Sequence, residues 1–357
     1  MASTLFPLHS PCRWLPDETL YSLCSRHHHL SGNVNAGHSA LELFGPGRNS
    51  GCKIGGLEEL SSRAGGHLGS AIEIAHERTL RSLYQPFMPP LSAQRLTAAM
   101  LAGTPGGLRQ ALDCDFDGVF ARHPLRACLR CAESDVATFH VAYWHRRHQW
   151  PGVYRCLRHR CPLMELVERP MHPNLFPWLL PSLDAMRRPV SSAGRRIANA
   201  LSATPPAPPW LGMKAREAAY WIPVPRSRPD EEVVLVRYAE LAIAAGENGH
   251  RMSFMPWVLA RLYRKLFDDR SVIMRRPFDA FSPPPVDLGW PEIARRNQPE
   301  VVRLTTVRGM PRHPVCHLLA LTGMGQTWDS FIRQYDAFAR GPGGSRPADL
   351  WNAPIRM

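Results

Sequence analysis

The feature that most constrains the fold is a pair of short metal-ligand motifs in the middle of the chain. Cys128 and Cys131 are separated by two residues, and after a gap of 24 residues Cys156 and His159 repeat that spacing. Two residues between ligands allow both side chains to converge on one tetrahedral ion, as in zinc knuckles. The sequence therefore predicts a small module built around a structural Zn²⁺ ion, with Cys128, Cys131, Cys156 and His159 as its four ligands.

Two nearby features leave alternatives open. Cys161 could supply the fourth ligand in place of His159, but Pro162 directly after it indicates that the chain is already leaving the site, so His159 is preferred. His145 and His148 have a spacing that could bind a second metal ion. No other ligand pair accompanies them, so we interpret them as hydrogen-bonding residues of the core or surface.

The motifs favour a binding protein over an enzyme. Four protein ligands leave no open position on the ion, and a catalytic metal needs one. Between Arg122 and Arg160 the only carboxylates are Glu133 and Asp135, against eight arginines. The sequence contains no P-loop, H-E-x-x-H, G-x-S-x-G or nucleobase-deaminase motif. We expect no catalytic residues and no enzymatic activity, and keep a nuclease built from dispersed carboxylates as a rival hypothesis.

The charge of the chain points to a polyanionic partner. Its 357 residues include 43 basic and 30 acidic ones, a net charge of +13, and nearly all the basic residues are arginines. Arginine binds phosphate through parallel hydrogen bonds, so nucleic acid is the expected partner, reached directly or through a bound protein. The candidate contacts to nucleic acid or a partner protein are two basic clusters, Arg146, Arg147, Arg155, Arg158 and Arg160 beside the zinc ligands, and Arg261, Arg264 and Lys265.

Apolar residues at helical spacing, separated by glycine- and proline-containing turns, predict a mainly α-helical fold. We expect a helical region at 1–120, which either contains a helix-turn-helix or is a small helical bundle with no groove-reading role. It is followed by a zinc-ribbon module at 121–170, a Pro-rich connector at 171–230 and a C-terminal helical domain at 231–345. The helices predicted in the first region are Asp17–Ser31, Ser39–Phe44, Leu57–Ala64, Ser70–Tyr84 and Ser92–Leu101. Those predicted in the last are Glu231–Ala245, stopped by Gly246, then Pro256–Phe267, Pro314–Leu321 and Trp328–Phe338, with Thr327 as the cap of the final helix.

The sequence also predicts where the protein resides. It shows neither a basic start followed by an apolar segment of signal-peptide length nor a run of 18 apolar residues. Its nine cysteines are an odd number, and four of them lie close together, which suits metal binding in a reducing compartment better than a disulfide framework. We expect a cytoplasmic, nucleoid-associated bacterial protein.

The chain resembles the TniQ/TnsD family of transposition target-selection proteins. The similarity is most specific in the zinc segment, where 143–153 reads Tyr-Trp-His-Arg-Arg-His-Gln-Trp-Pro-Gly-Val, and it is convincing from Leu15 to Leu166. Looser blocks that also look similar are Leu15–Ser22 with Arg26 and Ser31–Asn33, Leu43–Gly45, Thr79–Leu80, Tyr84–Phe87, and His313–Val315 with His317–Leu319.

This resemblance implies a non-catalytic adaptor for target-site selection in transposition and DNA recombination. Members of the family bind DNA or associate with a guide-RNA effector complex, and they recruit the AAA+ regulator of the transposon. The family's zinc-ligand pattern falls on Cys128, Cys131, Cys156 and His159. The alternative is a stand-alone, sequence-specific zinc-containing DNA-binding regulator that reads a major groove with the Leu57–Ala64 region or the Trp328–Phe338 helix. No pattern decides between a monomer and a homodimer.

Overall fold

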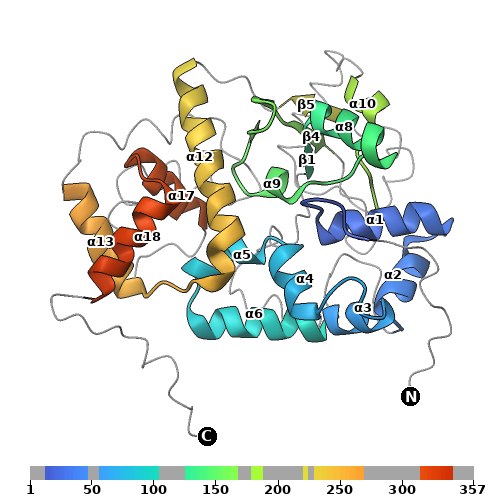
Figure 1. Cartoon of the computed structure of the whole chain (residues 1–357), viewed down its shortest axis with the longest axis horizontal. Coiled ribbons are helices and arrows are strands. Elements are labelled where there is room, and N and C mark those ends of the chain that lie inside the picture. Colours follow the sequence, from blue (N-terminus) through green and yellow to red (C-terminus); the bar gives the residue numbers. More distant parts are fainter. Residues whose placement is uncertain are drawn as a thin grey trace, which may run out of the picture.

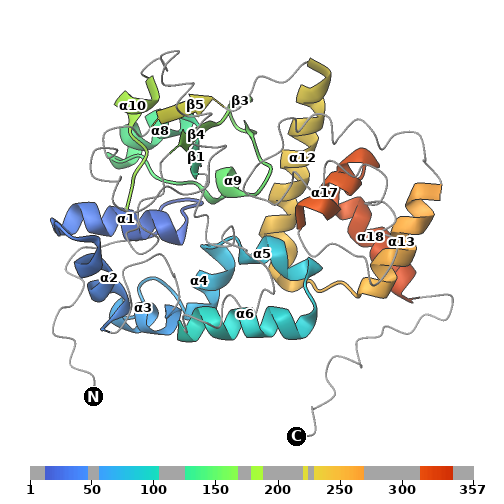
Figure 2. The same cartoon turned by 180° about the vertical axis from the view of Figure 1, so that it is seen from behind.

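The computed structural model of the chain describes residues 13–46, 56–103, 125–167, 178–187, 220–223, 229–268 and 314–340. The fold is mainly helical, as predicted. Its elements form three groups: N-terminal helices along the bottom of Figure 1, a small central module above them, and C-terminal helices on the opposite side of the long helix α12. Figure 2 shows from behind that α12 stands between the central module and the last helices.

The N-terminal group consists of short helices, some of which have a side-chain cap at their first turn. Helix α1 begins because the Thr19 hydroxyl accepts a hydrogen bond from the Ser22 amide, and it ends at Gly32, whose φ of 70° suits glycine. The group comprises α1 (Leu20–Ser31), α2 (Ala36–Phe44), α3 (Leu57–Arg63), α4 (Ala71–Glu77), α5 (Arg81–Tyr84), the 3₁₀ helix η1 (Gln85–Phe87) and α6 (Pro90–Ala102).

The helix predicted at Ser70–Tyr84 is two helices, because the chain breaks between α4 and α5. The Thr79 hydroxyl donates to the Ala75 carbonyl at 2.6 Å and accepts from the Arg81 amide at 3.2 Å, which replaces regular helical pairing there. The Arg78 carbonyl, released from the helix, accepts the Leu20 amide at 2.7 Å. The break therefore ties α4 to the first turn of α1.

The central module contains two small antiparallel sheets with short helices around them. One sheet has the order β1-β4-β5, with Leu125 opposite Leu166, and the other is the hairpin β2-β3, with Cys156 opposite Cys161. The elements are β1 (Leu125–Ala127), α8 (Leu129–Phe139), α9 (Arg146–Gln149), β2 (Arg155–Cys156), β3 (Cys161–Pro162), β4 (Met164–Val167), α10 (Leu183–Arg187) and β5 (Tyr220–Pro223).

Strand β5 and helix α10 fall within the segment 171–230, which the sequence predicts to be a Pro-rich connector. Strand β5 pairs with β4 along its whole length, so this part of the segment belongs to the sheet of the central module. The rest of the predicted connector, 171–177, 188–219 and 224–228, lies outside the described residues.

The C-terminal group is organised around α12 (Pro229–Asn248). The other elements are η5 (Gly249–Arg251), α13 (Pro256–Asp268), α17 (Pro314–Gly323) and α18 (Trp328–Arg340). Contrary to prediction, Gly246 does not end α12: the helix continues to Asn248, and Gly246 packs on Trp150. A Cβ atom at position 246 would collide with the Trp150 ring, so glycine serves here as a contact surface. The predicted cap of α18 is present, since the Thr327 hydroxyl accepts the Ser330 amide at 3.2 Å.

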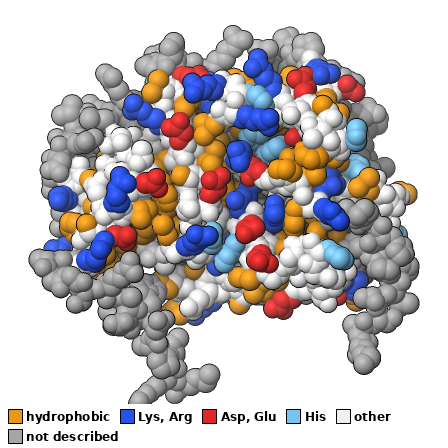
Figure 3. Space-filling model, viewed as in Figure 1, with side chains coloured by type: hydrophobic (Ala, Val, Ile, Leu, Met, Phe, Trp, Pro, Cys, Tyr) orange, Lys and Arg blue, Asp and Glu red, His pale blue; other side chains and the backbone are white. Residues whose placement is uncertain are grey.

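One hydrophobic core runs through all three groups, and its largest fully buried side chains include Trp144, Trp150, Tyr238 and Phe331. None of the helices in the described ranges is long and apolar enough to cross a membrane. On the face shown in Figure 3, basic side chains are spread over several elements rather than gathered in a single patch.

Candidate metal centre

The four predicted ligands come together where α8 meets the β2-β3 hairpin. Cys128 is the N-cap residue of α8 and Cys131 lies in its first turn, while Cys156 ends β2 and His159 lies in the turn that leads to β3. Their ligand atoms all lie within 4.8 Å of one another, with the three cysteines buried and His159 half-buried. The structure therefore forms a Cys₃His cluster that could hold a metal ion.

The distances within the cluster fit the edges of a tetrahedron around zinc. Bonds of about 2.3 Å to sulfur and about 2.0 Å to nitrogen place two ligand sulfurs about 3.8 Å apart, and a sulfur and a nitrogen about 3.5 Å apart. The Cys131 and Cys156 sulfurs are 3.7 Å apart. His159 Nδ1 lies 3.4 Å from the Cys128 sulfur, 3.3 Å from that of Cys131 and 3.7 Å from that of Cys156. These four distances match the edges of a zinc tetrahedron to within about 0.2 Å.

The protonation of the thiols gives a second indication. Hydrogen bonds from Cys128 and Cys131 hold the pKa of Cys156 well below its ordinary value, while the hydrogen bond to Cys131 raises the pKa of Cys128. Without a cation, the buried cluster thus favours a thiolate at Cys156 and a protonated thiol at Cys128. A divalent cation would stabilise all three cysteines as thiolates, because its positive charge offsets their mutual repulsion.

Cys161, the alternative fourth ligand, lies beside the cluster. Its sulfur is 3.5 Å from that of Cys128, and its backbone pairs with Cys156 across the hairpin. It does not belong to the group whose ligand atoms are mutually within reach, whereas His159 does. The geometry supports His159 as the fourth ligand and places the Cys161 thiol where it can donate to the Cys128 sulfur.

His148 also lies beside the cluster, next to the Cys131 sulfur. It is 1% exposed, its Nε2 lies 3.9 Å from the Cys131 sulfur, and burial lowers its pKa. Its Nδ1 has no hydrogen-bond partner among the described residues. A neutral ring with the proton on Nε2 can donate to a thiolate, and outer-shell donors of this kind orient metal ligands. The sequence marked His148 as a hydrogen-bonding residue but gave no sign of which residue it would contact.

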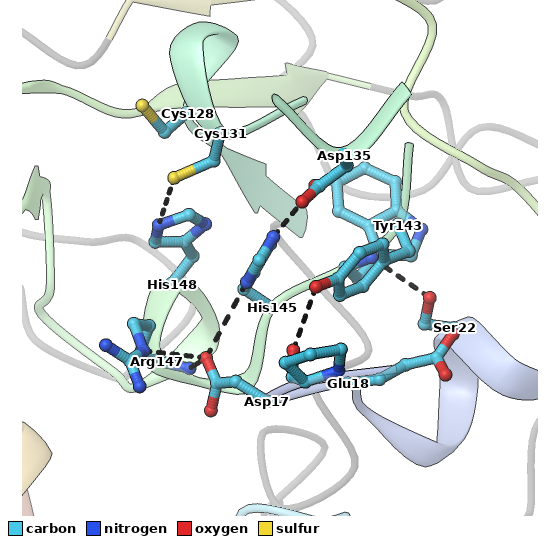
Figure 4. A network of polar contacts seen from close by, with 12 residues as sticks. Asp17, Glu18, Ser22, Cys128, Cys131, Asp135, Tyr143, His145, Arg147 and His148 are labelled. Atoms are coloured by element: carbon cyan, nitrogen blue, oxygen red, sulfur yellow. Dashed lines mark hydrogen bonds and ion pairs between the residues drawn. The ribbon is translucent and has the colours of Figure 1, made fainter. Parts of the chain in front are cut away.

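The segment that carries His148 also joins the central module to the N-terminal helices (Figure 4). The Trp144 amide donates to the Ser22 hydroxyl at 3.0 Å, and the Tyr143 hydroxyl donates to the Pro16 carbonyl at 2.9 Å. The Thr19 amide donates to the Trp144 carbonyl at 3.1 Å. We call this set of contacts between 143–147 and 16–22 the seam.

Asp17 is the charged centre of the seam. Its carboxylate accepts the Arg147 Nε at 2.8 Å and lies 3.9 Å from His145 Nδ1. On the other side of its ring, His145 Nε2 lies 2.8 Å from the Asp135 carboxylate. Asp17 has a φ of 58°, a left-handed conformation that few non-glycine residues adopt. His145 is therefore a hydrogen-bonding residue held between two carboxylates, as the sequence suggested.

The five predicted contact arginines of the central module are divided between internal and exposed positions. Arg146 donates to the His76 carbonyl at 2.9 Å, Arg147 pairs with Asp17, and the buried Arg155 pairs with Glu232 at 2.5 Å. Arg158 and Arg160, on the turn between β2 and β3, are exposed. The first three stabilise contacts between the groups of elements, and the last two face solvent beside the metal centre.

The second predicted cluster is separate from the first. Arg261 and Lys265 are exposed on α13, while the side chain of Arg264 lies outside the described residues. Helix α13 lies on the far side of α12 from the central module, as both ribbon views show (Figures 1 and 2). The structure does not bring the two basic clusters together.

The fold and the site define a helical protein in which a small Cys₃His module is packed against a group of short N-terminal helices. The model of the TniQ family matches residues 11–163, a segment that contains those helices, the seam and all four candidate ligands. This match confirms the resemblance seen in the sequence: the chain carries a TniQ domain, which implies a part in target selection for transposition. No similar sequence was found among curated proteins.

Proposed function

We propose that this protein is a non-catalytic adaptor that helps to choose the insertion site of a transposon. In this role it binds DNA or a targeting complex, such as a guide-RNA effector, and recruits the AAA+ regulator of the transposon. The observation that carries the proposal is the TniQ match, because it spans the N-terminal helices and the Cys₃His cluster as one continuous unit. The seam supports the same view, since it joins these two parts by hydrogen bonds.

The metal in this proposal is zinc, and its role is structural. Cys128, Cys131, Cys156 and His159 would complete a tetrahedron and leave no position for a substrate or an activated water. The carboxylates nearest in sequence are engaged elsewhere, since Asp135 bonds His145 and Glu133 pairs with Arg187 at 2.6 Å. Zinc would stabilise the folded state of the central module, because the free energy of metal binding adds to the free energy of folding in a small module.

The alternative, a stand-alone DNA-binding regulator, is less well supported by the surfaces of its two candidate recognition helices. The outward side chains of α3 include Glu58 and Glu59, which would repel phosphate. On α18 the exposed charged residues are balanced, with Asp329 and Asp336 against Arg333 and Arg340. Neither helix presents the basic face that reading a major groove requires.

Binding to DNA, with and without the AAA+ regulator and ATP, tests the proposal. Purified protein is titrated with labelled duplex across a range of salt concentrations. An adaptor is expected to bind weakly and without sequence preference alone, and more tightly when the regulator is on the DNA. Tight binding to one sequence that ignores the regulator would instead establish the stand-alone regulator. Cleavage that requires added Mg²⁺ or Mn²⁺ would show a nuclease.

A further inference from the structure

Helix α13 has an outer face that the fold itself does not use. Its inner face, Val258, Leu259, Leu262 and Tyr263, is buried to 2% exposure or less. The Tyr263 ring stacks on Phe331 of α18 at 6.2 Å between ring centroids. On the outer face, Trp257, Arg261 and Lys265 follow one another at intervals of four residues and are all exposed. We call these three residues the α13 stripe.

Trp257 is the unusual member of the stripe. It is 46% exposed, whereas Trp144, Trp150, Trp178 and Trp328 are each at most 5% exposed. Of the tryptophans whose side chains the structure describes, it alone is classed as exposed. Exposed apolar side chains are common, and Leu30, Leu91 and Val233 are more exposed than Trp257. What sets Trp257 apart is a flat aromatic face open to solvent one helical turn from Arg261.

The segment that carries the stripe is mainly basic. From Gly249 to Phe267 the sequence has four basic residues and no acidic one, and Asp268 is the first acidic residue after them. Neither Arg261 nor Lys265 forms a salt bridge with a residue whose side chain the structure describes. The Arg261 guanidinium lies 5.9 Å from the centre of the Phe338 ring. This contact restricts the conformation of the Arg261 side chain and leaves its positive charge unneutralised. The stripe is complementary to a partner that offers negative charge and flat apolar faces together.

A nucleic-acid strand with unpaired bases meets that description. Phosphates pair with exposed cations, and unstacked bases stack on aromatic side chains that are themselves open to solvent. In a duplex the base faces are covered by neighbouring pairs, so an indole gains little there beyond contact with the backbone. The stripe's aromatic side chain therefore distinguishes a single strand from a duplex.

We propose that the α13 stripe binds single-stranded nucleic acid, with Arg261 and Lys265 on the phosphates and Trp257 stacked on a base. This inference deepens the proposed function, because it rests on an adaptor that works on nucleic acid and assigns it a surface and a strand form. The surface lies across α12 from the central module, as both ribbon views show. It is therefore distinct from the metal centre and from Arg158 and Arg160, which are in the turn between β2 and β3 of that module.

The test measures fluorescence anisotropy of a labelled 20-nucleotide oligothymidine and of a mixed-sequence duplex of the same length. Trp257→Ala is expected to weaken single-strand binding about tenfold and to leave duplex binding nearly unchanged. The double variant Arg261→Gln/Lys265→Gln is expected to lower the slope of log affinity against log salt by about 1.4 for the single strand. The matched control, Arg333→Gln/Arg340→Gln on the exposed face of α18, removes the same charge next to the stripe.

Three results overturn the inference: equal binding by Trp257→Ala and the wild-type protein, an equal loss in the α18 control, or no single-strand binding by the wild-type protein. Weaker association of the stripe variants with the AAA+ regulator, with strand binding unchanged, would overturn it in favour of a protein interface. Association of the wild-type protein with the regulator on duplex DNA is measured on the same preparation. If the stripe fails these tests while the wild-type protein still associates with the regulator on duplex DNA, this inference is wrong and the proposed function stands. If that association is also missing, the proposed function fails.

Discussion

At the scale of single residues, the cluster makes Cys156 the ligand whose loss is most informative. Its sulfur lies against those of Cys128 and Cys131, and its hydrogen bonds to them already favour the thiolate. Cys156→Ala is expected to abolish stoichiometric metal binding and to remove cooperative unfolding of the central module, because the remaining ligands leave the ion incompletely bound. Metal content by mass spectrometry and thermal unfolding check this, with Cys24→Ala, a buried cysteine of α1 outside the cluster, as the control. A Cys156→Ala protein that keeps its zinc and its melting profile would refute the ligand assignment.

His148 gives a prediction about metal affinity rather than metal stoichiometry. Replacing it with phenylalanine keeps a buried ring but removes the donor that faces the Cys131 sulfur. We expect the metal affinity to fall roughly 10- to 100-fold, as for other outer-shell partners of metal ligands. Competition with a chelator measures the affinity, and the absorption of the Co²⁺-substituted protein reports on the thiolates. His67→Phe, at an exposed position, serves as the control, and an unchanged affinity in His148→Phe would contradict the role.

Contacts that the sequence predicted and contacts that it missed differ in how local their signal is. The clustering of Cys128, Cys131, Cys156 and His159 could be predicted because the two residues of each pair are close in sequence, at a spacing that lets their side chains converge. The partners of Arg147 and Arg155 could not, since Asp17 is 130 residues from Arg147 and Glu232 is 77 from Arg155. Three of the arginines chosen as contacts therefore pair or donate inside the fold, a fact that only the folded chain reveals.

At the scale of elements, Gly246 is the point where α12 meets the central module. Gly246→Ala adds a methyl group that collides with the Trp150 ring. Although alanine favours helix, the overpacking is expected to outweigh that gain and to lower the free energy of unfolding by about 1–3 kcal/mol. Denaturant unfolding measures the change, with Glu240→Ala on the exposed face of α12 as the control. Greater stability in Gly246→Ala than in the wild type would show that helix propensity dominates and that the contact is loose.

The same glycine explains why helix bounds were only partly predictable. Glycine after an apolar pattern is a usual stop signal, but here the residue continues the helix because a tryptophan 96 positions earlier needs the space. Conversely, the Ser70–Tyr84 pattern looked continuous, and Thr79 broke it through local hydrogen bonds. Strand β5 was missed because a four-residue strand next to prolines has no periodic signal of its own. The presence of the long helices could be predicted from the sequence. The residues at which they begin and end depended on tertiary contacts, which the sequence pattern does not show.

At the scale of the whole molecule, His76 tests how the N-terminal helices meet the C-terminal group. Its ring lies 5.4 Å from that of His250 in η5, and burial, Arg81 and His250 together lower its pKa to about 4. The folded protein thus binds the His76 proton more weakly than the unfolded chain does. Stability is full above pH 6.5 and is lost as the pH falls from about 6.5 towards 4. His76→Gln is expected to reduce that slope, by at most about 1.4 kcal/mol per pH unit.

Denaturant unfolding at several pH values, with wild type and variant loaded with the same metal, measures this difference. His29→Gln, at an exposed position on α1, provides the control. If wild-type protein and His76→Gln lost stability in parallel between pH 6.5 and 5, the contact with His250 would not be sensitive to protonation of His76.

We propose that the whole molecule, through a TniQ domain stabilised by a metal ion, selects where a transposon inserts. The most direct measurement maps insertion sites when the element's own transposase and AAA+ regulator act with this protein, without it, or with Cys156→Ala. We predict that insertions concentrate at defined positions only with the wild-type chain, and that Cys156→Ala gives the same distribution as its omission. An unchanged number and distribution of insertions without the protein would contradict the claim.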